Sequence, residues 1–373
     1  MFNYLKKRRK INILTFWGVP NYGAWCQAYA LQKIISTLYP NFVVKQIAYL
    51  HPKHKALYFP KLPKFEFNTF IHRSIFKLWF KYLKQGNTDT SPFGKAWLSI
   101  PNIKCKNKKK LEDKKWDIFI TGSDCIWEYS IEDFGNDEHL IGNNINCNNL
   151  ISYATSFGDM NLGDELPDFV SYGLYNYNNI SVRDKSSYDI VKSILGNKIS
   201  VPIVLDPVLL HDFKYDSNFH SSKYSNYILV YGDEFSDSLI KELIDFAHLN
   251  KLTIIGAGIV PDWCDIKLKN IDPREWIGLF KNANYTVTCT FHGLMFSILF
   301  EKHFLFYQVE YVKNRSQTLL ENLKLSNFCY HEGVNNVDKI LLSSLWNYKD
   351  INKELKILKE KSLDFIKDSI KND

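Results

Sequence analysis

Two successive runs of strand–helix alternation constrain the fold of this chain more than any other feature of its sequence. Short apolar runs, as expected for buried strands, occur in the first half at 11–17, 42–49, 116–121, 150–154, 179–183 and 201–205, with helical spacing of apolar residues over 24–38. The same order begins again with predicted strands at 226–231, 252–255 and 285–289 and predicted helices at 236–249, 276–282 and 294–300. Strands that alternate with helices form parallel sheets covered by helices on both faces. We therefore predict an α/β fold of two Rossmann-like, doubly wound domains that face a cleft.

The polar stretch 212–225, rich in Ser, Asp, His and Lys, marks the boundary between the two domains. We predict an N-terminal domain over 1–211, a C-terminal domain over 226–345 and an amphipathic C-terminal helix over 346–373, with apolar positions at 351, 355, 358, 366 and 370. A length of 373 residues suits about two domains. Residues 51–115 do not follow the alternation and are predicted to be an insertion in the first domain.

The predicted insertion carries most of the positive charge of the chain. The formal net charge is only +7, but residues 51–115 hold sixteen Lys or Arg against four Asp or Glu, a net of +12. A predicted helix over 71–84 sets basic side chains opposite an apolar face of Ile71, Ile75, Leu78, Trp79 and Tyr82. Basic amphipathic helices bind anionic lipid, so the insertion predicts contact with a membrane surface or a lipid-linked acceptor. Packing of the aromatic face on the N-terminal domain is an equal alternative. No nucleic-acid partner is expected, because residues 116–373 sum to −12 and hold no nucleic-acid motif.

Absent patterns exclude or disfavour several classes of protein. No stretch reaches the roughly 18–20 apolar residues of a membrane-spanning helix, and the apolar run at 11–19 lacks a signal-peptide cleavage site. Seven cysteines without a C-x-x-C pair disfavour a disulfide framework or a zinc site, and favour a reducing cytoplasm. There is no P-loop, and Pro261 breaks the dinucleotide fingerprint that Gly256 and Gly258 could begin. H-E-x-x-H and G-x-S-x-G are missing too, so the sequence predicts no metal and no cofactor.

Candidate site residues follow the predicted strands, because ligands of α/β sheets bind beyond the carboxyl ends of the strands. Gly18–Ala24 leads from the first strand into a helix, and its glycines and free N–H groups suit an anion or sugar hydroxyls. Thr121–Trp127 sets Ser123 and Asp124 at another strand end, where plain helix capping is the alternative.

Three cationic groups stand at further strand or helix ends. Arg183 closes a predicted strand and suits a carboxylate or phosphate, with a salt bridge to Asp184 or Asp206 as the alternative. His292 opens an apolar helix, where it could bind an anion or transfer a proton, although a buried structural histidine fits as well. Arg315, near the start of a later helix, could help to hold phosphate or could lie on a solvated surface.

Six motifs in a fixed order give the chain a resemblance to a known family. They are Asn-Tyr-Gly-Ala-x-x-Gln-Ala-Tyr-Ala-Leu at 21–31, Gly-Ser-Asp-x-x-Trp at 122–127, Tyr-Ala-x-Ser-Phe-Gly at 153–158, Ser-Val-Arg at 181–183, Leu-Asp-Pro at 205–207 and Phe-His-Gly-x-x-Phe-Ser-Ile at 291–298. The set resembles the polysaccharide pyruvyl transferase family over about residues 11–330, but poorly over 51–110. The resemblance implies a fold like that of the two-domain GT-B glycosyltransferases. It also implies transfer of a pyruvyl group from phosphoenolpyruvate onto a sugar, usually as a ketal across two hydroxyls.

The resemblance further implies roles for single residues. His292 would bind the donor phosphate and transfer a proton, and the donor side is completed by Arg183, Gly293 and Arg315. The N-terminal domain would meet the acceptor sugar through Asn21, Tyr22, Gly23, Ser123 and Asp124, with Asp124 as the general base. The acceptor would belong to a cell-surface polysaccharide or a lipid-linked oligosaccharide, met in the cytoplasm or at the inner face of the cell membrane.

The chain departs from the family pattern at three positions. Thr290 stands where some relatives have an arginine two residues before the motif histidine, and Cys289 stands where many have an acidic residue. Cys125 replaces the usual glutamine after Gly-Ser-Asp. With one donor cation lost, a GT-B glycosyltransferase whose His292 and Arg315 hold the diphosphate of a nucleotide sugar is the second hypothesis. A sugar-binding relative without turnover is the third.

Overall fold

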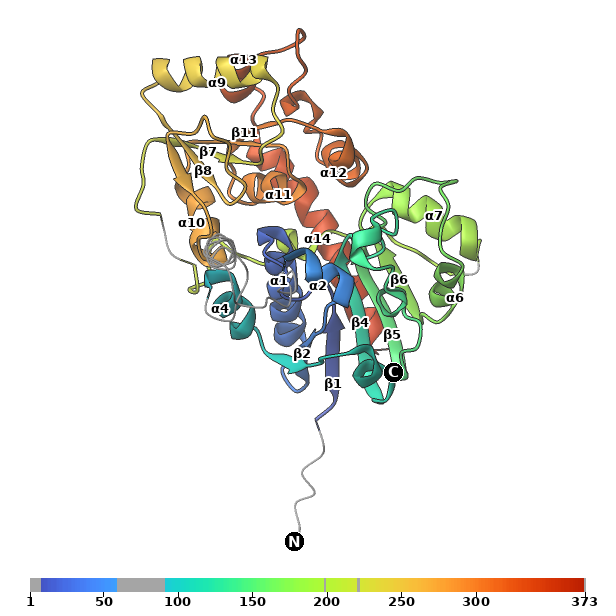
Figure 1. The fold of residues 1–373 in the computed structure, drawn as a ribbon. Coiled ribbons are helices and arrows are strands. Elements are labelled where there is room, and N and C mark those ends of the chain that lie inside the picture. The colour runs from blue at the N-terminus through green and yellow to red at the C-terminus, as the bar shows by residue number, and fades with distance from the viewer. Residues whose placement is uncertain (1–7, 59–90, 198, 220–221, 372–373) are drawn as a thin grey trace, which may run out of the picture.

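A computed structural model describes residues 8–58, 91–197, 199–219 and 222–371, which form two α/β domains, each around one sheet (Figure 1). From edge to edge, the N-terminal sheet holds β3 (Asn102–Lys104), β2 (Val43–Ala48), β1 (Lys10–Leu14), β4 (Trp116–Asp124), β5 (Cys147–Thr155) and β6 (Asn179–Val182). The C-terminal sheet holds β11 (His303–Phe306), β10 (Tyr285–Thr288), β7 (Tyr227–Tyr231), β8 (Thr253–Ala257) and β9 (Ile266–Leu268).

Both sheets are parallel throughout, and the first has the strand order 3-2-1-4-5-6 of the Rossmann fold. The predicted α/β fold of two Rossmann-like domains, GT-B-like in its plan, is confirmed. The inner strands are buried on both faces and therefore read as continuous apolar runs in the sequence. β7, for example, is buried along all five of its residues, and Ile13 of β1 pairs with Ile120 of β4.

Helices cover both faces of each sheet (Figure 1). In the first domain they are α1 (Tyr22–Leu38), α2 (Pro52–Tyr58), α4 (Pro92–Ser99), α5 (Lys108–Glu112), α6 (Phe169–Tyr175), α7 (Lys185–Leu195) and α8 (Pro207–Leu210). In the second they are α9 (Asp237–Leu249), α10 (Pro273–Asn282), α11 (Phe291–Leu299), α12 (Glu310–Asn322) and α13 (Val337–Leu341). Side chains before the first turn cap several of them, such as Asp184 on α7, Ser236 on α9 and Thr290 on α11.

The predicted C-terminal helix is α14 (Tyr348–Lys371), which runs from the second domain back to the first (Figure 1). At its start the Tyr348 hydroxyl donates to the carbonyl of Lys302 beside the C-terminal sheet. Near its end the carbonyl of Ser369 accepts from Asn149 Nδ2 of β5 at 2.9 Å. The helix thereby fastens the two domains together. No helix among the described residues is both long and apolar enough to cross a membrane.

Two predictions about the first domain need correction or limitation. Residues 201–205 are not a strand, because they form only a single bridge, Val182 to Ile203, and Pro202 has no N–H to donate to a ladder. The segment 51–115 is not wholly an insertion, since its residues 102–104 are β3, which pairs with β2. The helix predicted over 71–84 lies outside the described residues.

Candidate functional site

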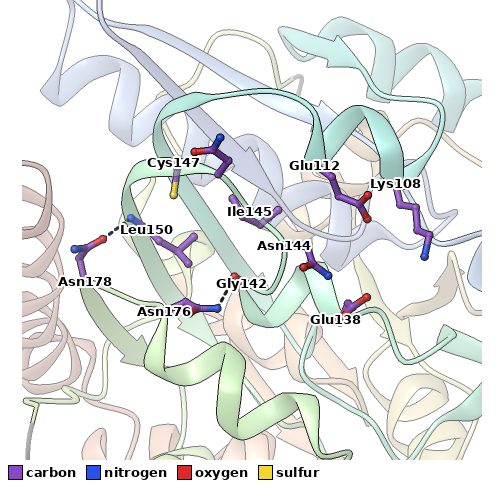
Figure 2. Close-up of a pocket in the computed structure, with 11 residues that line it drawn as sticks. Lys108, Glu112, Glu138, Gly142, Asn144, Ile145, Cys147, Leu150, Asn176 and Asn178 are labelled. Carbon is purple, nitrogen blue, oxygen red and sulfur yellow. Dashed lines mark hydrogen bonds between the residues drawn. The ribbon is translucent and has the colours of Figure 1, made fainter.

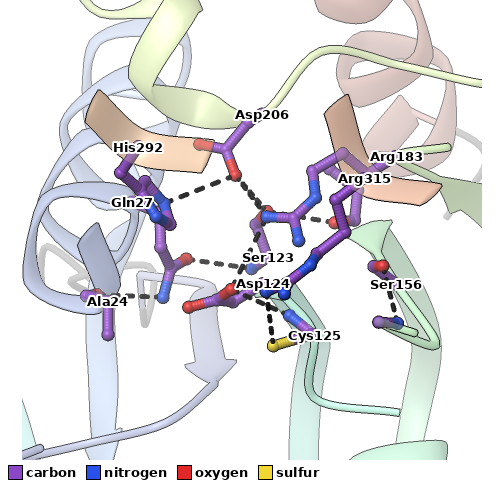
Figure 3. Close-up of polar contacts among 12 residues, drawn as sticks. Ala24, Gln27, Ser123, Asp124, Cys125, Ser156, Arg183, Asp206, His292 and Arg315 are labelled. Carbon is purple, nitrogen blue, oxygen red and sulfur yellow. Dashed lines mark hydrogen bonds and ion pairs between the residues drawn. The ribbon is translucent and has the colours of Figure 1, made fainter. Parts of the chain in front are cut away.

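Side chains from both domains meet where strands of the two sheets end (Figure 3). Asp124 is the last residue of β4, Arg183 follows β6, and Asp206 precedes α8 in the N-terminal domain. His292 comes from the first turn of α11 and Arg315 from α12 in the C-terminal domain. Four of these five were predicted as site residues from the sequence, and the structure brings those four together.

Arg183 is the centre of this cluster and is almost wholly buried. Its Nη1 donates to Asp206 Oδ2 at 2.8 Å and lies 3.6 Å from Asp124 Oδ1. Of the two salt bridges considered from the sequence, the one to Asp206 is therefore present, while Asp184 caps α7. Burial alone would lower the pKa of Arg183, but the carboxylates of Asp206 and Asp124 outweigh it and raise the pKa. The guanidinium is thus always charged.

His292 lies beside this ion pair without joining it. Its side chain is 12% exposed, and its Nε2 is 4.0 Å from Asp206 Oδ2, too far for a hydrogen bond. Burial lowers the pKa of His292, and the carboxylates of Asp206 and Asp124 oppose this shift only in part. The imidazole is therefore neutral near pH 7 and able to accept a proton.

The pKa of Asp124 shifts against the effect of burial, whereas that of His292 shifts with it. Burial alone would raise its pKa, but His292 and Arg183 outweigh burial and hold the pKa below the ordinary value of an aspartate. Its Oδ1 also accepts from the backbone N–H of Cys125 at 2.9 Å. Such a carboxylate stays ionised and is a weak base, so it is better suited to stabilise a nearby positive charge than to take a proton.

Arg315 reaches the cluster from the C-terminal domain. Its Nη1 lies 3.9 Å from the sulfur of Cys125, and its Nη2 donates to the carbonyl of Tyr311. Burial, with a further contribution from Asp124, raises the pKa of Cys125 to about 12. The thiol is protonated at neutral pH and is no nucleophile, so Cys125 serves here as a packing neighbour of the guanidinium.

Several buried nitrogen atoms of the cluster have no hydrogen-bond partner among the described residues. They are Nε and Nη2 of Arg183, Nε of Arg315 and Nε2 of His292. A buried donor left without a partner costs about 1–3 kcal/mol, so the three guanidinium nitrogens together favour a bound acceptor. A cavity of about 30 Å³ touches Arg183, Asp206 and Arg315. The arrangement suits an anion that accepts hydrogen bonds from both guanidinium groups.

Three of the predicted acceptor-side residues have their polar atoms bound within the protein. Asn21 Oδ1 accepts from a backbone N–H in the first turn of α1 at 3.0 Å. The Tyr22 hydroxyl donates to the carbonyl of Ile271 in the other domain at 3.1 Å. Ser123 is fully buried, and its Oγ donates to a backbone carbonyl of β5 at 3.0 Å. These groups cap a helix, join the domains and hold a strand end, and the role in sugar binding predicted for them stays a prediction.

Two predicted site glycines are required by close packing. A Cβ on Gly23 would lie 2.0 Å from His292 Nδ1, so only glycine leaves room for the imidazole ring at the start of α1. A Cβ on Gly293 would lie 2.1 Å from Thr288 Oγ1. The N–H of Gly293 donates to Thr290 Oγ1 at 3.1 Å, because Thr290 caps α11. The contact of Gly293 with a donor phosphate stays a prediction.

Asp206 and Gln27 are site residues that the sequence reasoning did not select. Asp206 Oδ2 accepts from Arg183 and also from Ser123 Oγ, at 3.2 Å. Gln27 Oε1 accepts from the backbone N–H of Ser123 at 3.1 Å, while its Nε2 donates to Thr15 Oγ1 at 2.9 Å. Both lie inside motifs of the family resemblance, which is the signal that could have found them.

A larger cavity of about 670 Å³ lies away from this cluster, at the other end of β4 and β5 (Figure 2). Its polar side chains include Glu112, Asn176 and Asn178. The two asparagines are engaged with the backbone, Asn178 Oδ1 accepting from Leu150 N–H and Asn176 Nδ2 donating to the carbonyl of Gly142. No predicted site residue lines this cavity. Within the described ranges, no three His, Cys, Asp or Glu side chains gather into a set that could hold a metal ion.

The chain matches the family model described as polysaccharide pyruvyl transferase over residues 21–311. No curated protein matches it. Among solved structures, S. aureus MnaA with UDP is 11% identical, with 96% of this chain and 90% of that chain covered and a TM-score of 0.47. A putative UDP-N-acetylglucosamine 2-epimerase from Listeria monocytogenes is 6% identical, with 96% and 90% covered and a TM-score of 0.46. E. coli heptosyltransferase WaaC with ADP is 12% identical, with 80% and 87% covered and a TM-score of 0.37. At such low TM-scores these likenesses do not bear on the reaction.

Proposed function

Because this chain belongs to the polysaccharide pyruvyl transferase family, we propose that it moves a pyruvyl group from phosphoenolpyruvate onto two hydroxyls of one sugar, forming a ketal. The chain is an enzyme of this transferase kind, and the donor and the product are the proposal. The observation that carries it is the set of buried, unpartnered nitrogen atoms on Arg183, Arg315 and His292. Phosphoenolpyruvate offers a carboxylate and a phosphate in a small molecule, so it can accept from two guanidinium groups at once.

The chemistry requires one proton to be delivered and two to be removed. Carbon C3 of the donor gains a proton, and C2 forms bonds to two sugar oxygens while its bond to the phosphate oxygen breaks. Of the two protons lost by the sugar hydroxyls, one balances the proton gained at C3 and the other leaves with phosphate. Positive charge develops at C2 as the phosphate departs, so nearby carboxylates stabilise the transition state.

We assign the proton transfers to His292. A neutral imidazole can take the proton of the attacking hydroxyl, and the imidazolium so formed lies 4.0 Å from the Asp206 carboxylate. Asp124, the base predicted from the sequence, has a pKa held below its ordinary value and would take a proton less readily. It is better suited to stabilise the positive charge on C2. Arg183 and Arg315 would bind the donor carboxylate and phosphate.

A nucleotide-sugar donor is less well supported by the charges at the C-terminal sheet. Asp233 and Glu234 are exposed directly after β7 and would repel a diphosphate there. A diphosphate would need hydrogen-bond donors in the first turn of α11. The Gly293 N–H there already donates to Thr290 Oγ1. Both features favour a small donor held at Arg183 over a nucleotide held along the C-terminal sheet.

Thermal unfolding with each donor tests this proposal. We expect phosphoenolpyruvate to raise the Tm by several degrees, whereas UDP-glucose and GDP-mannose should leave it unchanged. Mass spectrometry after incubation with phosphoenolpyruvate and a panel of glycosides should then find one ketal-linked pyruvyl group on a product. A shift with a nucleotide sugar and none with phosphoenolpyruvate would favour the glycosyltransferase hypothesis instead.

We also propose that the acceptor is met at an anionic membrane surface, as a lipid-linked saccharide. Basic residues gather at the end of the N-terminal sheet opposite the cluster, where Arg8, Arg9, Lys10, Lys114 and Lys115 line a cavity of about 270 Å³. The lysines of α5, at 108–110, are exposed and lie shortly before Lys114 in the sequence. Basic side chains near an anionic surface each contribute about 1 kcal/mol to binding.

Vesicle co-sedimentation tests the membrane proposal. The wild type should sediment with phosphatidylglycerol vesicles and not with phosphatidylcholine vesicles. Reversal of charge at Lys108, Lys109 and Lys110 to Glu should weaken this binding, whereas the same change at the exposed lysines 349, 353 and 356 of α14 should not. Equal and negligible sedimentation with both kinds of vesicle would remove the membrane from the proposal.

A further inference from the structure

Three partly exposed aromatic side chains each follow a strand of the C-terminal sheet. Two of these strands, β7 and β8, are neighbours, and the third, β11, is separated from β7 by β10. Phe235 follows β7, Trp263 follows β8 and Tyr307 follows β11. The ring centroid of Phe235 lies 6.0 Å from that of Trp263 and 6.0 Å from that of Tyr307. These three residues, which we name the aromatic row, therefore extend along the carboxyl edge of the sheet, where ligands of α/β folds bind.

Carboxylates adjoin the aromatic row without a cation to neutralise them. Asp233 and Glu234 directly precede Phe235, are exposed, and have no ion pair among the residues that the structure describes. Their backbone groups approach the sulfur of Cys289. The surface thus combines ring faces with negative charge, and this combination disfavours a phosphorylated ligand.

The aromatic row and the site cluster approach one another along the chain, where Tyr311 follows Tyr307 by four residues. Tyr311 is 38% exposed, and its ring lies 5.8 Å from the guanidinium of Arg315. Burial raises the pKa of Tyr311, and Cys289 and Glu234 add to the shift. Cys289 in turn lies three positions before His292 in the chain. Because Tyr311 and Arg315 follow Tyr307 by four and eight residues, a ligand on the aromatic row would lie toward the side of the cluster that holds Arg315.

We propose that the aromatic row, with Asp233 and Glu234, binds the acceptor sugar as an uncharged pyranose. The C–H groups on one face of a pyranose carry partial positive charge and stack on the negative face of an aromatic ring. The hydroxyls at its edge donate to carboxylates. This inference rests on the proposed function, which requires a sugar acceptor beside His292. It assigns that acceptor to the C-terminal domain, in contrast to the N-terminal acceptor side predicted from the sequence.

Saturation-transfer NMR on the full chain tests the inference without need of turnover. The probes are the methyl pyranosides of glucose, galactose and mannose, which carry no aromatic group of their own. For the wild type we expect transfer to the ring protons of at least one probe. Trp263→Ala combined with Tyr307→Ala should reduce that transfer about tenfold, because two stacking faces are lost. Tyr215→Ala, at a tyrosine that is 83% exposed elsewhere, is the matched control and should leave transfer unchanged.

The result of this test can be distinguished from the result of the thermal test for phosphoenolpyruvate as the donor. A double variant that loses sugar transfer but keeps the rise in Tm with phosphoenolpyruvate supports the inference and rules out a general loss of fold. Undiminished transfer in the double variant, or no transfer from any probe to the wild type, would overturn it. If phosphoenolpyruvate shifts no Tm while sugar transfer depends on the aromatic row, the donor assignment fails and the acceptor assignment stands.

Discussion

Two buried histidines of this protein differ in how their ring nitrogens are paired. The side chain of His139, in the short turn of 3-10 helix η2 (Glu138–Ile141), is 2% exposed, and that of His292 in α11 is 12% exposed. His139 Nδ1 lies 2.7 Å from Asp137 Oδ1, and its Nε2 lies 3.0 Å from Glu112 Oε1. Within the described part of the chain, the carboxylate within ion-pair distance of His292 is that of Asp206, at 4.0 Å.

These distances decide the protonation of each ring. Burial alone would lower both pKa values, since it disfavours the charged form. At His139 the hydrogen bonds to Asp137 and Glu112 outweigh burial and raise the pKa. At His292 no hydrogen bond compensates for burial, and the pKa falls. A carboxylate in contact favours the protonated form of a histidine, whereas one slightly farther away leaves the ring neutral and able to accept a proton.

The two environments also fit different tasks. Glu112 ends α5 and Asp137 adjoins η2, so His139 ties the lysine-rich segment to the first domain, beside the cavity of Figure 2. Both of its nitrogens are used, which leaves nothing for a ligand. His292 instead stands between the domains with Nε2 unpartnered among the described residues. The paired ring of His139 stabilises the fold, whereas the unpartnered Nε2 of His292 can take part in a reaction.

The largest expected effect is on turnover at His292. His292→Gln keeps a polar side chain but removes the proton acceptor, so kcat should fall about 10²- to 10⁴-fold. The rise in Tm with phosphoenolpyruvate should persist, because Arg183 and Arg315 remain. Steady-state rates, with Tm as the check on folding, measure both.

The pH dependence of kcat in the wild type provides the control for this prediction. Because burial lowers the pKa of His292, kcat should rise with pH along a limb that lies below about pH 6.5, the usual pKa of histidine. A variant that turns over at the wild-type rate, or a limb above that value, would contradict the assignment of His292 as base.

The next largest effect is on stability at His139. His139→Ala leaves Asp137 as a buried carboxylate without its cation, so the free energy of unfolding should fall by about 3–5 kcal/mol. Urea denaturation measures the change, and kcat per folded molecule should stay the same. His331→Ala, at an exposed histidine, should cost less than about 0.5 kcal/mol. A large loss of kcat with little loss of stability at His139 would reverse the contrast between the two histidines.

The sequence was sufficient to predict His292 as a site residue. It was not sufficient to distinguish a histidine that stabilises the fold, such as His139, from one that we propose as a base, such as His292. Its place at the end of β10 follows from the apolar run before it and the cap after it, because parallel strands end at one edge. Most strands were predicted in the same way. The pairing of a histidine depends on carboxylates that are distant in the chain, such as Asp206 for His292, and no local pattern reports those distances.

The acceptor-side motif also has a structural part that its local pattern does not report. Gly23 and Tyr22 stand in a motif at a strand end, which predicted contact with a ligand. In the fold, the gap left by Gly23 is filled by His292, and the Tyr22 ring stacks on Trp276 at 5.0 Å. Both neighbours come from the other domain. A motif can thus mark where two domains meet as well as where a substrate binds.

Gly23→Ala should have a smaller effect that depends on His292. The added Cβ would lie 2.0 Å from His292 Nδ1 and must displace the ring, so we expect kcat to fall about ten- to a hundredfold. Alanine favours a helix over glycine by up to about 1 kcal/mol, so stability should not fall in parallel. In the His292→Gln background the same substitution should have much less effect on kcat. Independent, multiplicative losses would show that Gly23 does not act through His292.

The smallest expected effect is a pH dependence of stability that follows from the pairing of His139 with Asp137. Its pKa is raised in the folded protein, so its contribution to stability is complete below the unfolded value of about 6.5 and is lost as the pH rises through the folded pKa above it. The pKa of Asp137 is lowered, because the bonds from His139 outweigh burial, so its contribution is present above about pH 4 and is lost at more acid pH.

The difference in the free energy of unfolding between wild type and His139→Gln should therefore be largest between about pH 4 and pH 6.5 and shrink at higher pH. Urea denaturation at several values between about pH 5 and pH 9 measures it. His292→Gln should not give this profile, because burial lowers the pKa of His292 and the unfolded chain takes up the proton first below about pH 6.5, which is the opposite trend. A difference at His139 that stays constant, or grows, with rising pH would mean that its ring is neutral in the fold. The two histidines would then differ in position alone and not in charge.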